Sequence, residues 1–242
     1  MKIDFYEEFP TDENLKKLKL IDFPTRIFVA AKSLDEFKKL EKRIKKINKK
    51  VECAYWPIIR NSYWISPFSN TKDLIDLFKE LEACDNHLLI DLEFPLNKKM
   101  IFKNLFSWRK NKKIIRRFLE KNKARVTTAQ FPSPLISRFI RLVGLDYDVK
   151  VEKSLMWYSS IISKSINERI KRYLIRLKNK SDYSVSLGTI AFGVFGDEPI
   201  LSPEDLERDL MFVKRAGFEK IVIFRLGGLN EKYMDIIKKF ID

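Results

Sequence analysis

The sequence is poor in the residues that build metal and redox sites. It has one histidine, His87, and two cysteines, Cys53 and Cys84, among 242 residues. One histidine excludes hydrolases whose metal is held by several histidines, and two cysteines are too few for a disulfide framework or a zinc knuckle. We expect both cysteines to be reduced and buried, and His87 to be a packing residue. The sequence implies no metal and no cofactor, which directs attention to carboxylates.

Long apolar runs are also missing. No stretch approaches the ~18 apolar residues of a membrane span, and the first ten residues are acidic, unlike a signal peptide. We therefore expect no membrane span and a cytoplasmic location. Positive charge is abundant, because 48 Lys and Arg against 33 Asp and Glu give a net charge of +15. Since these residues recur along helix faces, we expect most of them to be solvated, with nucleic acid a disfavoured partner and the oligomeric state open.

Short apolar, β-rich runs alternate with helical patterns along the whole chain. Eight runs have the composition of strands: 2–9, 26–31, 51–56, 87–94, 124–131, 149–158, 183–192 and 220–226. Between them, Ser33, Asn70 and Ser202 stand at helix-start positions. Eight such units in a chain of this length predict an α/β protein, a (β/α)8 TIM barrel, with residues 1–242 as a single domain. An open doubly wound sheet is the alternative, but its Gly-rich first turn is absent.

Alternation along the expected strands predicts which side chains face the barrel lumen. The helix-facing set should be the more apolar, so Leu88, Ile90 and Leu92 face outward while Asp91 and Glu93 face inward. The same logic turns inward several other side chains near the C-terminal strand ends: Glu8, Lys32, Trp56, Thr128, Gln130, Tyr158 and Arg225. Barrel enzymes place their sites at this mouth, and polar groups there are costly unless they are paired or used. We therefore predict a functional site at the mouth.

The most informative motif is Asp91-x-Glu93. Its two carboxylates face the same side of one strand, ~6.5 Å apart along the chain, and repulsion between them raises one pKa. A glutamic acid that is protonated near neutral pH is suited to act as a general acid. Trp56 and Trp64 add flat apolar faces near the same rim. Aromatic faces beside paired carboxylates are what a sugar ring requires, so the residues favour a carbohydrate site.

Two of the strand endings carry a family resemblance. The D-x-E at 91–93 and the M-x-Y at 156–158 resemble the pattern of glycoside hydrolase family 18, the chitinase-like barrels. The resemblance implies that Glu93 is the acid, that Asp91 orients the substrate's N-acetyl group and that Tyr158 supports that group. Hydrolysis in this family is assisted by the substrate. The chain departs from the family's fuller pattern at four positions: Asn86, Leu89, Ser159 and Arg225.

A second catalytic carboxylate is an open alternative. Glu198 follows the seventh expected strand, where retaining glycosidases place a carboxylate about 5–5.5 Å from the acid, and Glu8 is a third candidate. For the hydrolase, we expect a small-molecule or oligosaccharide substrate. The residues expected to bind it are Glu8, Lys32, Trp56, Trp64, Gln130, Trp157 and Arg225.

Two other functions also stay open. The barrel could be an isomerase or lyase for a phosphorylated metabolite, with Gly227-Gly228 holding the phosphate and Lys32 and Arg225 adding positive charge. It could also be a non-catalytic barrel that binds a glycan or a nucleic acid.

Overall fold

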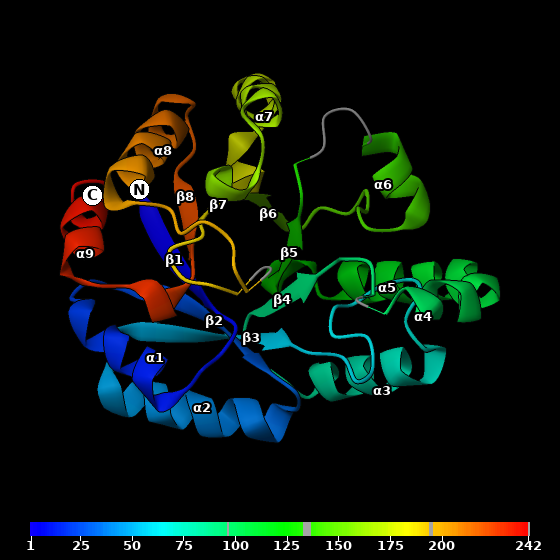
Figure 1. The fold of residues 1–242 in the computed structure, drawn as a ribbon. Helices are drawn as coiled ribbons and strands as arrows, with labels where there is room; N and C mark the ends of the chain where they lie inside the picture. Colours follow the sequence, from blue (N-terminus) through cyan, green and yellow to red (C-terminus); the bar gives the residue numbers. More distant parts are fainter. Residues whose placement is uncertain (96, 133–136, 194–195, 242) are drawn as a thin grey trace.

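The computed structural model of the chain is a closed barrel of eight parallel strands (Figure 1). It describes residues 1–95, 97–132, 137–193 and 196–241. Each strand pairs with its neighbours in the chain, and the last pairs with the first. The strands are β1 (Lys2–Glu7), β2 (Thr25–Ala31), β3 (Val51–Pro57), β4 (Leu88–Asp91), β5 (Val126–Gln130), β6 (Glu152–Trp157), β7 (Tyr183–Gly188) and β8 (Lys220–Phe224). All eight predicted strands are present, so the predicted TIM barrel is confirmed.

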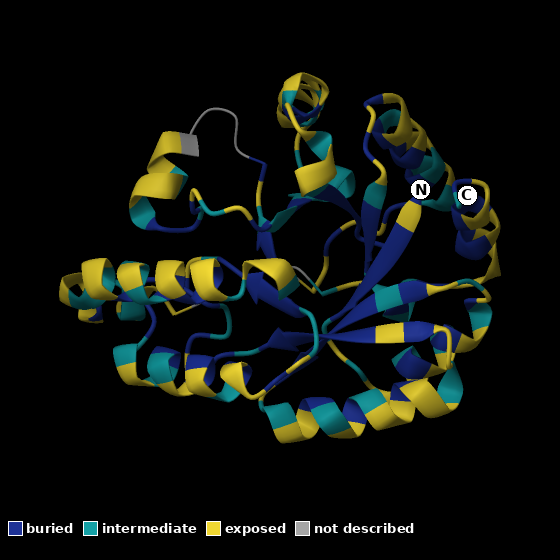
Figure 2. Cartoon of the chain, turned by 180° about the vertical axis from the view of Figure 1, so that it is seen from behind, coloured by how far each residue is buried: buried dark blue, intermediate teal, exposed yellow. Residues whose placement is uncertain are grey.

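Helices surround the ring of strands (Figure 1). In the described ranges, the α-helices are α1 (Asp12–Lys16), α2 (Leu34–Ile47), α3 (Thr71–Glu82), α4 (Lys98–Lys103), α5 (Trp108–Lys121), α6 (Ser137–Val143), α7 (Lys164–Arg176), α8 (Pro203–Arg215) and α9 (Glu231–Lys238). Short 3-10 turns are η1 (Lys17–Leu20), η2 (Leu105–Ser107), η3 (Lys123–Arg125), η4 (Ser159–Ile161), η5 (Lys180–Asp182) and η6 (Leu226–Gly228). The strands are mostly buried, and the outer faces of the helices are exposed (Figure 2).

The predicted helix starts are confirmed by their caps. The side chains of Ser33, Asn70 and Ser202 each accept a hydrogen bond from a backbone amide in the first turn of α2, α3 and α8. At α2, the Glu36 carboxylate also accepts a hydrogen bond from the Lys32 amide, at 2.8 Å. These bonds satisfy amide groups that a helix end otherwise leaves without a partner.

The apolar core has two layers, one between the strands and the helices and one inside the barrel. Inside the barrel, the ring of Tyr6 lies 5.3 Å from that of Phe28, 5.6 Å from that of Trp56 and 6.5 Å from that of Phe224, measured between centroids. Side chains therefore fill the lumen, as is usual for this fold. The aromatic layer forms a floor beneath the mouth of the barrel.

The predicted facing of β5 was wrong by one residue. Asp91 pairs with Ala129 in the parallel register, and Leu89 pairs with Thr127, so Thr127 and Ala129 face the lumen. Simple alternation predicts Thr128 and Gln130 at these positions instead. Threonines stand at adjacent positions of this strand, so its polarity does not alternate, and pairing with β4 decides which side faces inward.

The predicted facing of β8 was also wrong. Gly188 pairs with Phe224, and Phe224 belongs to the apolar layer inside the barrel. Arg225 follows the last residue of the strand and does not point into the lumen. The strand ends two residues earlier than the apolar run suggested, because the chain turns into η6 directly after Arg225.

The single histidine and the two cysteines lie away from the mouth of the barrel and pack within the fold. Nε2 of His87 lies 2.8 Å from Oγ1 of Thr127, and burial lowers the pKa of this imidazole to about 3. His87 is thus a neutral packing residue, as predicted. Both Cys53 and Cys84 are free and buried. Within the described ranges, no helix has the length and apolar character that crossing a bilayer requires.

Candidate active site

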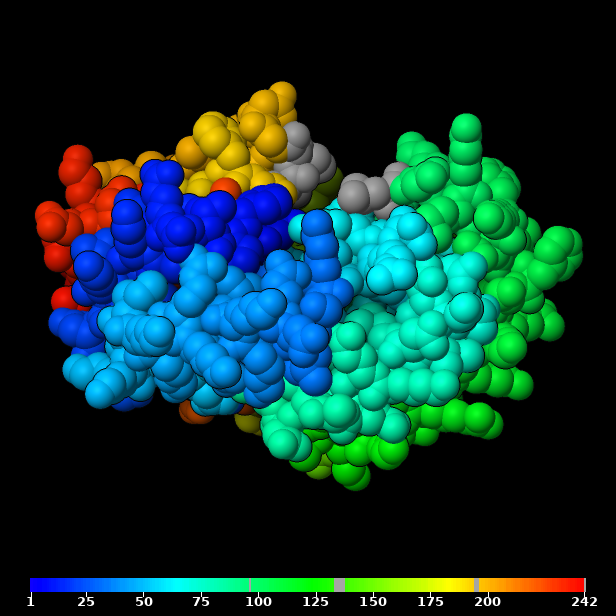
Figure 3. All heavy atoms as spheres, turned by 90° about the horizontal axis from the view of Figure 1, so that it is seen from below, coloured from blue at the N-terminus to red at the C-terminus, as the bar shows by residue number. Residues whose placement is uncertain are grey.

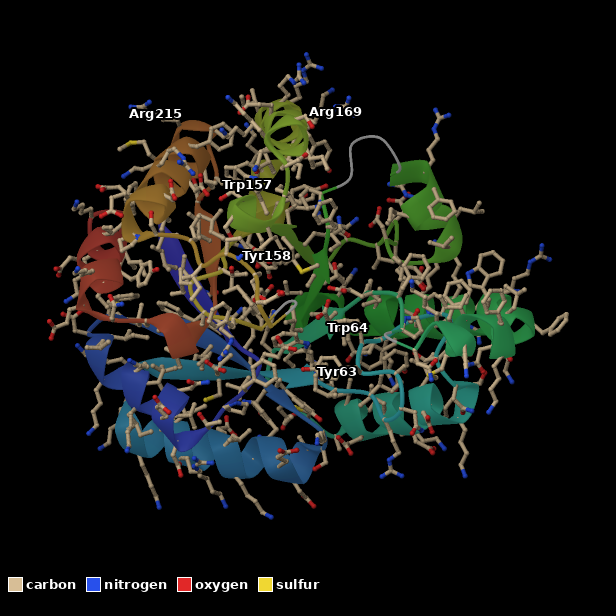
Figure 4. The ribbon with its side chains drawn as sticks, in the orientation of Figure 1. Tyr63, Trp64, Trp157, Tyr158, Arg169 and Arg215 are labelled. Carbon is tan, nitrogen blue, oxygen red and sulfur yellow. The ribbon has the colours of Figure 1, made fainter. Side chains whose placement is uncertain are left out.

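A cavity of about 520 Å³ opens at the C-terminal ends of the strands. It brings together seven of the predicted site residues, which lie at or just after the ends of five strands or in the loop after β3: Glu8, Trp56, Trp64, Asp91, Glu93, Gln130 and Tyr158. The remaining wall is mainly apolar, and includes Phe94, Phe131, Ile140, Leu145, Met156, Ile161 and Ile162. The volume is typical of sites that take a small molecule or a few sugar units. Figure 4 labels Trp64 and Tyr158 on different sides of this mouth.

Three carboxyl groups share the cavity. Burial raises the pKa of Glu93 to about 7, and the nearby charge of Glu8 adds to this shift. Burial, and then the charges of Glu93 and Glu8, raise the pKa of Asp91 well above its ordinary range. Burial also raises the pKa of Glu8, although a hydrogen bond from Tyr63 opposes the shift. The raised pKa of Glu93 agrees with the prediction from Asp91-x-Glu93 that one carboxyl of the pair titrates near neutral pH, and the pKa of Asp91 is raised as well.

Several buried polar atoms around the cavity lack partners. Of the five such side-chain atoms in the described parts of the chain, three belong to cavity residues: Nε1 of Trp56, Oδ1 of Asp91 and Oε1 of Gln130. Buried polar groups in folded proteins are normally hydrogen-bonded, so these exceptions need an explanation. One donor and two acceptors without partners, on residues that line a single cavity, suit a site for a polar ligand.

Tyr158 supplies a hydroxyl group that stays protonated. Burial, and then the neighbouring Tyr6 and the cavity carboxyls, raise its pKa well above the ordinary value for tyrosine. Its ring lies 5.2 Å from that of Phe224, which fixes it against the aromatic floor. Tyr158 is thus a hydrogen-bond donor at neutral pH, in the cavity that contains Asp91 and Glu93.

The loop after β3 folds across the edge of the cavity. The Ile65 amide donates to the Asp91 carbonyl at 3.0 Å, which extends the pairing beyond the strand ends. The Tyr63 hydroxyl donates to Oε1 of Glu8 at 2.5 Å. Tyr63 has a φ of 67°, an uncommon conformation for a residue with a side chain. Sequence reasoning placed Trp64 here but missed Tyr63, although the adjacent aromatic residues were a usable signal.

Two predicted substrate contacts lie elsewhere. Trp157 is fully buried on the outer side of β6, where its indole Nε1 donates to Oδ1 of Asn167 at 2.8 Å and its ring packs on Phe212 (Figure 4). Its neighbours in the motif face inward, so alternation along the strand turns Trp157 toward the helices. The Lys32 side chain is exposed and does not line the cavity.

Glu198 does not line the cavity either. Its two carboxylate oxygens accept hydrogen bonds from the amides of Gly193 and Gly196, at 2.6 and 2.7 Å. The group is buried and stabilises the loop after β7. In this position it is not a second carboxylate beside Glu93, because local amides hold it within its own loop.

Arg225 is bound to the protein and does not line the cavity. Its guanidinium donates to the Phe192 carbonyl and, at 3.2 Å, to Oε1 of Glu7, and it lies over the ring of Phe9. Glu7 is a residue that the sequence analysis missed, because alternation along β1 directed attention to Glu8.

The Glu7 carboxylate also occupies the position proposed for a phosphate. Its Oε2 accepts a hydrogen bond from the Gly227 amide at 2.7 Å. The alternative function as an isomerase or lyase requires this amide to bind the phosphate of the substrate. The amide instead donates its hydrogen bond to the Glu7 carboxylate. Among the described residues, no group of three or more His, Cys, Asp or Glu could hold a metal ion.

Comparison with known proteins gives a fold likeness and no sequence match. No protein-family model and no curated protein matches the chain. Similar solved structures include the spore cortex-lytic enzyme SleL of Bacillus megaterium, with 12% identity over 100% of this chain and 74% of that chain, and a TM-score of 0.62. The class V chitinase of Nicotiana tobaccum has 12% identity over 96% of this chain and 97% of that one, with a TM-score of 0.56.

A third similar structure contains a sugar. It is a mutant of the GH18 chitinase from Cycas revoluta in complex with (GlcNAc)4, with 9% identity over 99% of this chain and 98% of that one, and a TM-score of 0.55. The fold is that of the chitinase-like barrels. The resemblance predicted from two strand endings is thus confirmed for the fold of the whole described chain.

Proposed function

We propose that this protein is a glycoside hydrolase that cleaves an oligosaccharide containing N-acetylated sugars, with Glu93 as the general acid. The observation that carries the proposal is a carboxyl group with a pKa of about 7, beside a buried second carboxyl, in a cavity lined by tryptophan. Near neutral pH, Glu93 exists in both protonation states, as a group that donates and then recovers a proton requires. Trp64, which is half-buried in the wall of the cavity, offers a face against which a sugar ring can stack, and the buried Trp56 lies in the floor beneath it.

In the proposed reaction, Glu93 gives up one proton in the first step and recovers one in the second. The Glu93 carboxyl donates its proton to the glycosidic oxygen as the bond from that oxygen to the anomeric carbon breaks. The carbonyl oxygen of the substrate's N-acetyl group attacks the anomeric carbon, held in place by Asp91 and the Tyr158 hydroxyl. Water then displaces this oxygen and returns a proton to Glu93. The binding of Glu198 by the amides of its own loop supports assistance by the substrate, because a carboxylate held in this way does not line the cavity as a nucleophile would.

The test is Glu93→Gln, assayed on N-acetylglucosamine oligosaccharides. We expect activity to fall about 10²–10⁴-fold, the usual contribution of a general acid, with an unchanged thermal unfolding midpoint or a higher one. The exposed Glu13→Gln is the matched control and should keep full activity. On a dinitrophenyl glycoside the loss should be much smaller, because this leaving group departs without a proton. Equal turnover by Glu93→Gln and the unsubstituted protein on the oligosaccharide would end the assignment and favour a non-catalytic glycan-binding barrel.

A further inference from the structure

Exposed apolar side chains gather on two neighbouring segments of the barrel's outer surface. Of thirteen large hydrophobic residues that are exposed in the described parts of the chain, five lie on α4, η2 and α6. Phe106 is 99% exposed and Phe102 78% exposed. We call the five residues the apolar patch: Phe102, Leu105, Phe106, Phe139 and Leu142.

The two segments that carry the apolar patch are joined by hydrogen bonds. The Trp108 indole, at the start of α5, donates to the Val143 carbonyl at the end of α6, at 2.8 Å. Nζ of Lys112 donates to the carbonyls of Arg141 and Leu142, each at 2.8 Å. Since η2 leads directly into α5, these bonds hold the segment that carries α4 and η2 beside α6. Figure 1 shows α4, α5 and α6 at one edge of the molecule, and the green segments form one end of the surface in Figure 3.

The same region is strongly basic. Nine Lys and Arg residues and no Asp or Glu lie within residues 97–119, and α6 adds Arg138 and Arg141. Among the described residues, only two of these eleven cations form an ion pair, Arg116 with Glu120 and Arg141 with Asp146. The charge around the apolar patch is therefore largely uncompensated by the protein.

We propose that the apolar patch docks on an anionic lipid surface. Exposed phenylalanine and leucine side chains are unfavourable in water. Here they project from two short helical segments, between lysines and arginines. This combination suits the boundary of a bilayer, where apolar tips enter the acyl region and cations meet lipid phosphates. Binding is peripheral, through side chains of the surface.

Docking would place the cavity next to the lipid. Ile140 of α6 lines the cavity, whereas its neighbours Phe139 and Leu142 point outward. One short helix thus supplies both a wall of the cavity and part of the apolar patch. The proposal goes beyond the proposed hydrolase and does not depend on it, because activity on soluble oligosaccharides does not require the apolar patch.

The experiment is co-sedimentation of the full chain with vesicles of phosphatidylcholine, with or without an equal share of phosphatidylglycerol. We expect binding to the anionic vesicles only, and weaker binding as salt is added. The double substitution Phe102→Ser and Phe106→Ser should weaken binding about ten-fold or more, since burying one such side chain contributes about 1.5–3 kcal/mol and 1.4 kcal/mol is a factor of ten. The control is Ile175→Ser on α7, a residue that is 55% exposed and distant in sequence from the apolar patch.

Several results would overturn the proposal. The first is the absence of binding to anionic vesicles at low salt. The second is equal loss of binding in the Ile175→Ser control. The third is a concentration-dependent dimer that the double variant abolishes, because the apolar patch would then be covered by a second copy. Tighter binding of the same patch to duplex or single-stranded DNA would assign the charge to nucleic acid instead. Circular dichroism of each variant separates these outcomes from misfolding.

Discussion

Glu7 and the pair formed by Asp91 and Glu93 lie at the same mouth of the barrel, and they differ in how the protein compensates their charge. Glu7 accepts hydrogen bonds from the amides of Phe9 and Gly227 and from the Asn14 side chain, and it pairs with Arg225. Asp91 and Glu93 form no ion pair with any residue that the structure describes, and Oδ1 of Asp91 lacks a hydrogen-bond partner there. The protein thus supplies Glu7 with a full set of hydrogen bonds and a counter-charge, whereas Asp91 and Glu93 line the cavity without a counter-charge.

This difference in partners distinguishes a structural carboxylate from a candidate functional one better than the type of residue does. Burial raises the pKa of Glu7 as well, but Arg225 and three hydrogen-bond donors oppose that shift. Nothing comparable opposes the shift at Asp91. A carboxylate with complete partners stabilises the fold, whereas an incomplete one reduces stability and is retained where it meets a ligand. We therefore expect substitutions in the two groups to have opposite effects on stability.

The largest expected effect on stability is at Glu7. In Glu7→Gln, an amide nitrogen replaces one of two oxygens that both accept hydrogen bonds, so an N–H group faces another N–H group. The half-buried Arg225 also loses its counter-charge. We expect the free energy of unfolding to fall by about 3–5 kcal/mol, measured by urea denaturation. The control is Glu52→Gln, which removes an exposed ion pair with Arg26 and should change stability by less than about 0.5 kcal/mol. Equal losses in the two variants would contradict the comparison.

The pH dependence of stability should reveal Glu93. Its pKa is about 7 in the folded protein against 4.5 ordinarily, so the folded state binds the proton more tightly. The contribution of this group is therefore fully present below about pH 4.5 and is lost as pH rises to about 7, by an amount on the order of 3 kcal/mol. We expect the difference in unfolding free energy between the unsubstituted protein and Glu93→Gln to change over this window. A constant difference from pH 4 to 8 would show that Glu93 titrates normally.

The smallest expected change in stability is at Asp91. Asp91→Asn keeps the shape of the side chain and removes repulsion from Glu93 and Glu8, so we expect a gain of about 0.5–2 kcal/mol at pH 7. Activity on oligosaccharides should nevertheless fall. Thermal unfolding and turnover, measured on the same preparation, give both quantities. A destabilised Asp91→Asn with normal turnover would place Asp91 with Glu7, as a structural residue.

The fold was predictable because its signal repeats. Each of the eight apolar runs and the helix that follows it indicates one β/α unit. Errors of one to four residues at the strand ends therefore do not change the predicted number of strands or the fold. The cavity was predictable where polar and apolar residues alternate strictly, as at Asp91 and Glu93. At β5 the alternation fails and at β8 the strand ends early, so the predicted facing of the side chains was wrong in both strands.

What sequence could not show is which polar side chains already have partners. Arg225 lies 218 residues from Glu7 along the chain, and Gly227 lies 220 residues from it. No local pattern reports such contacts, so Glu7 was overlooked and Arg225 was assigned to the substrate. Glu198 was misplaced for a related reason, because its partners are backbone amides, which every residue type provides.

The aromatic floor has a consequence for how protons travel. Tyr6, Phe28, Trp56 and Phe224 fill the barrel beneath the carboxyl groups, so protons on Asp91 and Glu93 reach bulk solvent through the mouth. A ligand that fills the cavity blocks this route. The protonation state of the carboxyl groups at the start of a turnover is then set at the moment of binding. Under the proposed hydrolysis, the pH at which the ligand binds would decide whether Glu93 carries the proton that it donates, and the water that enters later restores that proton.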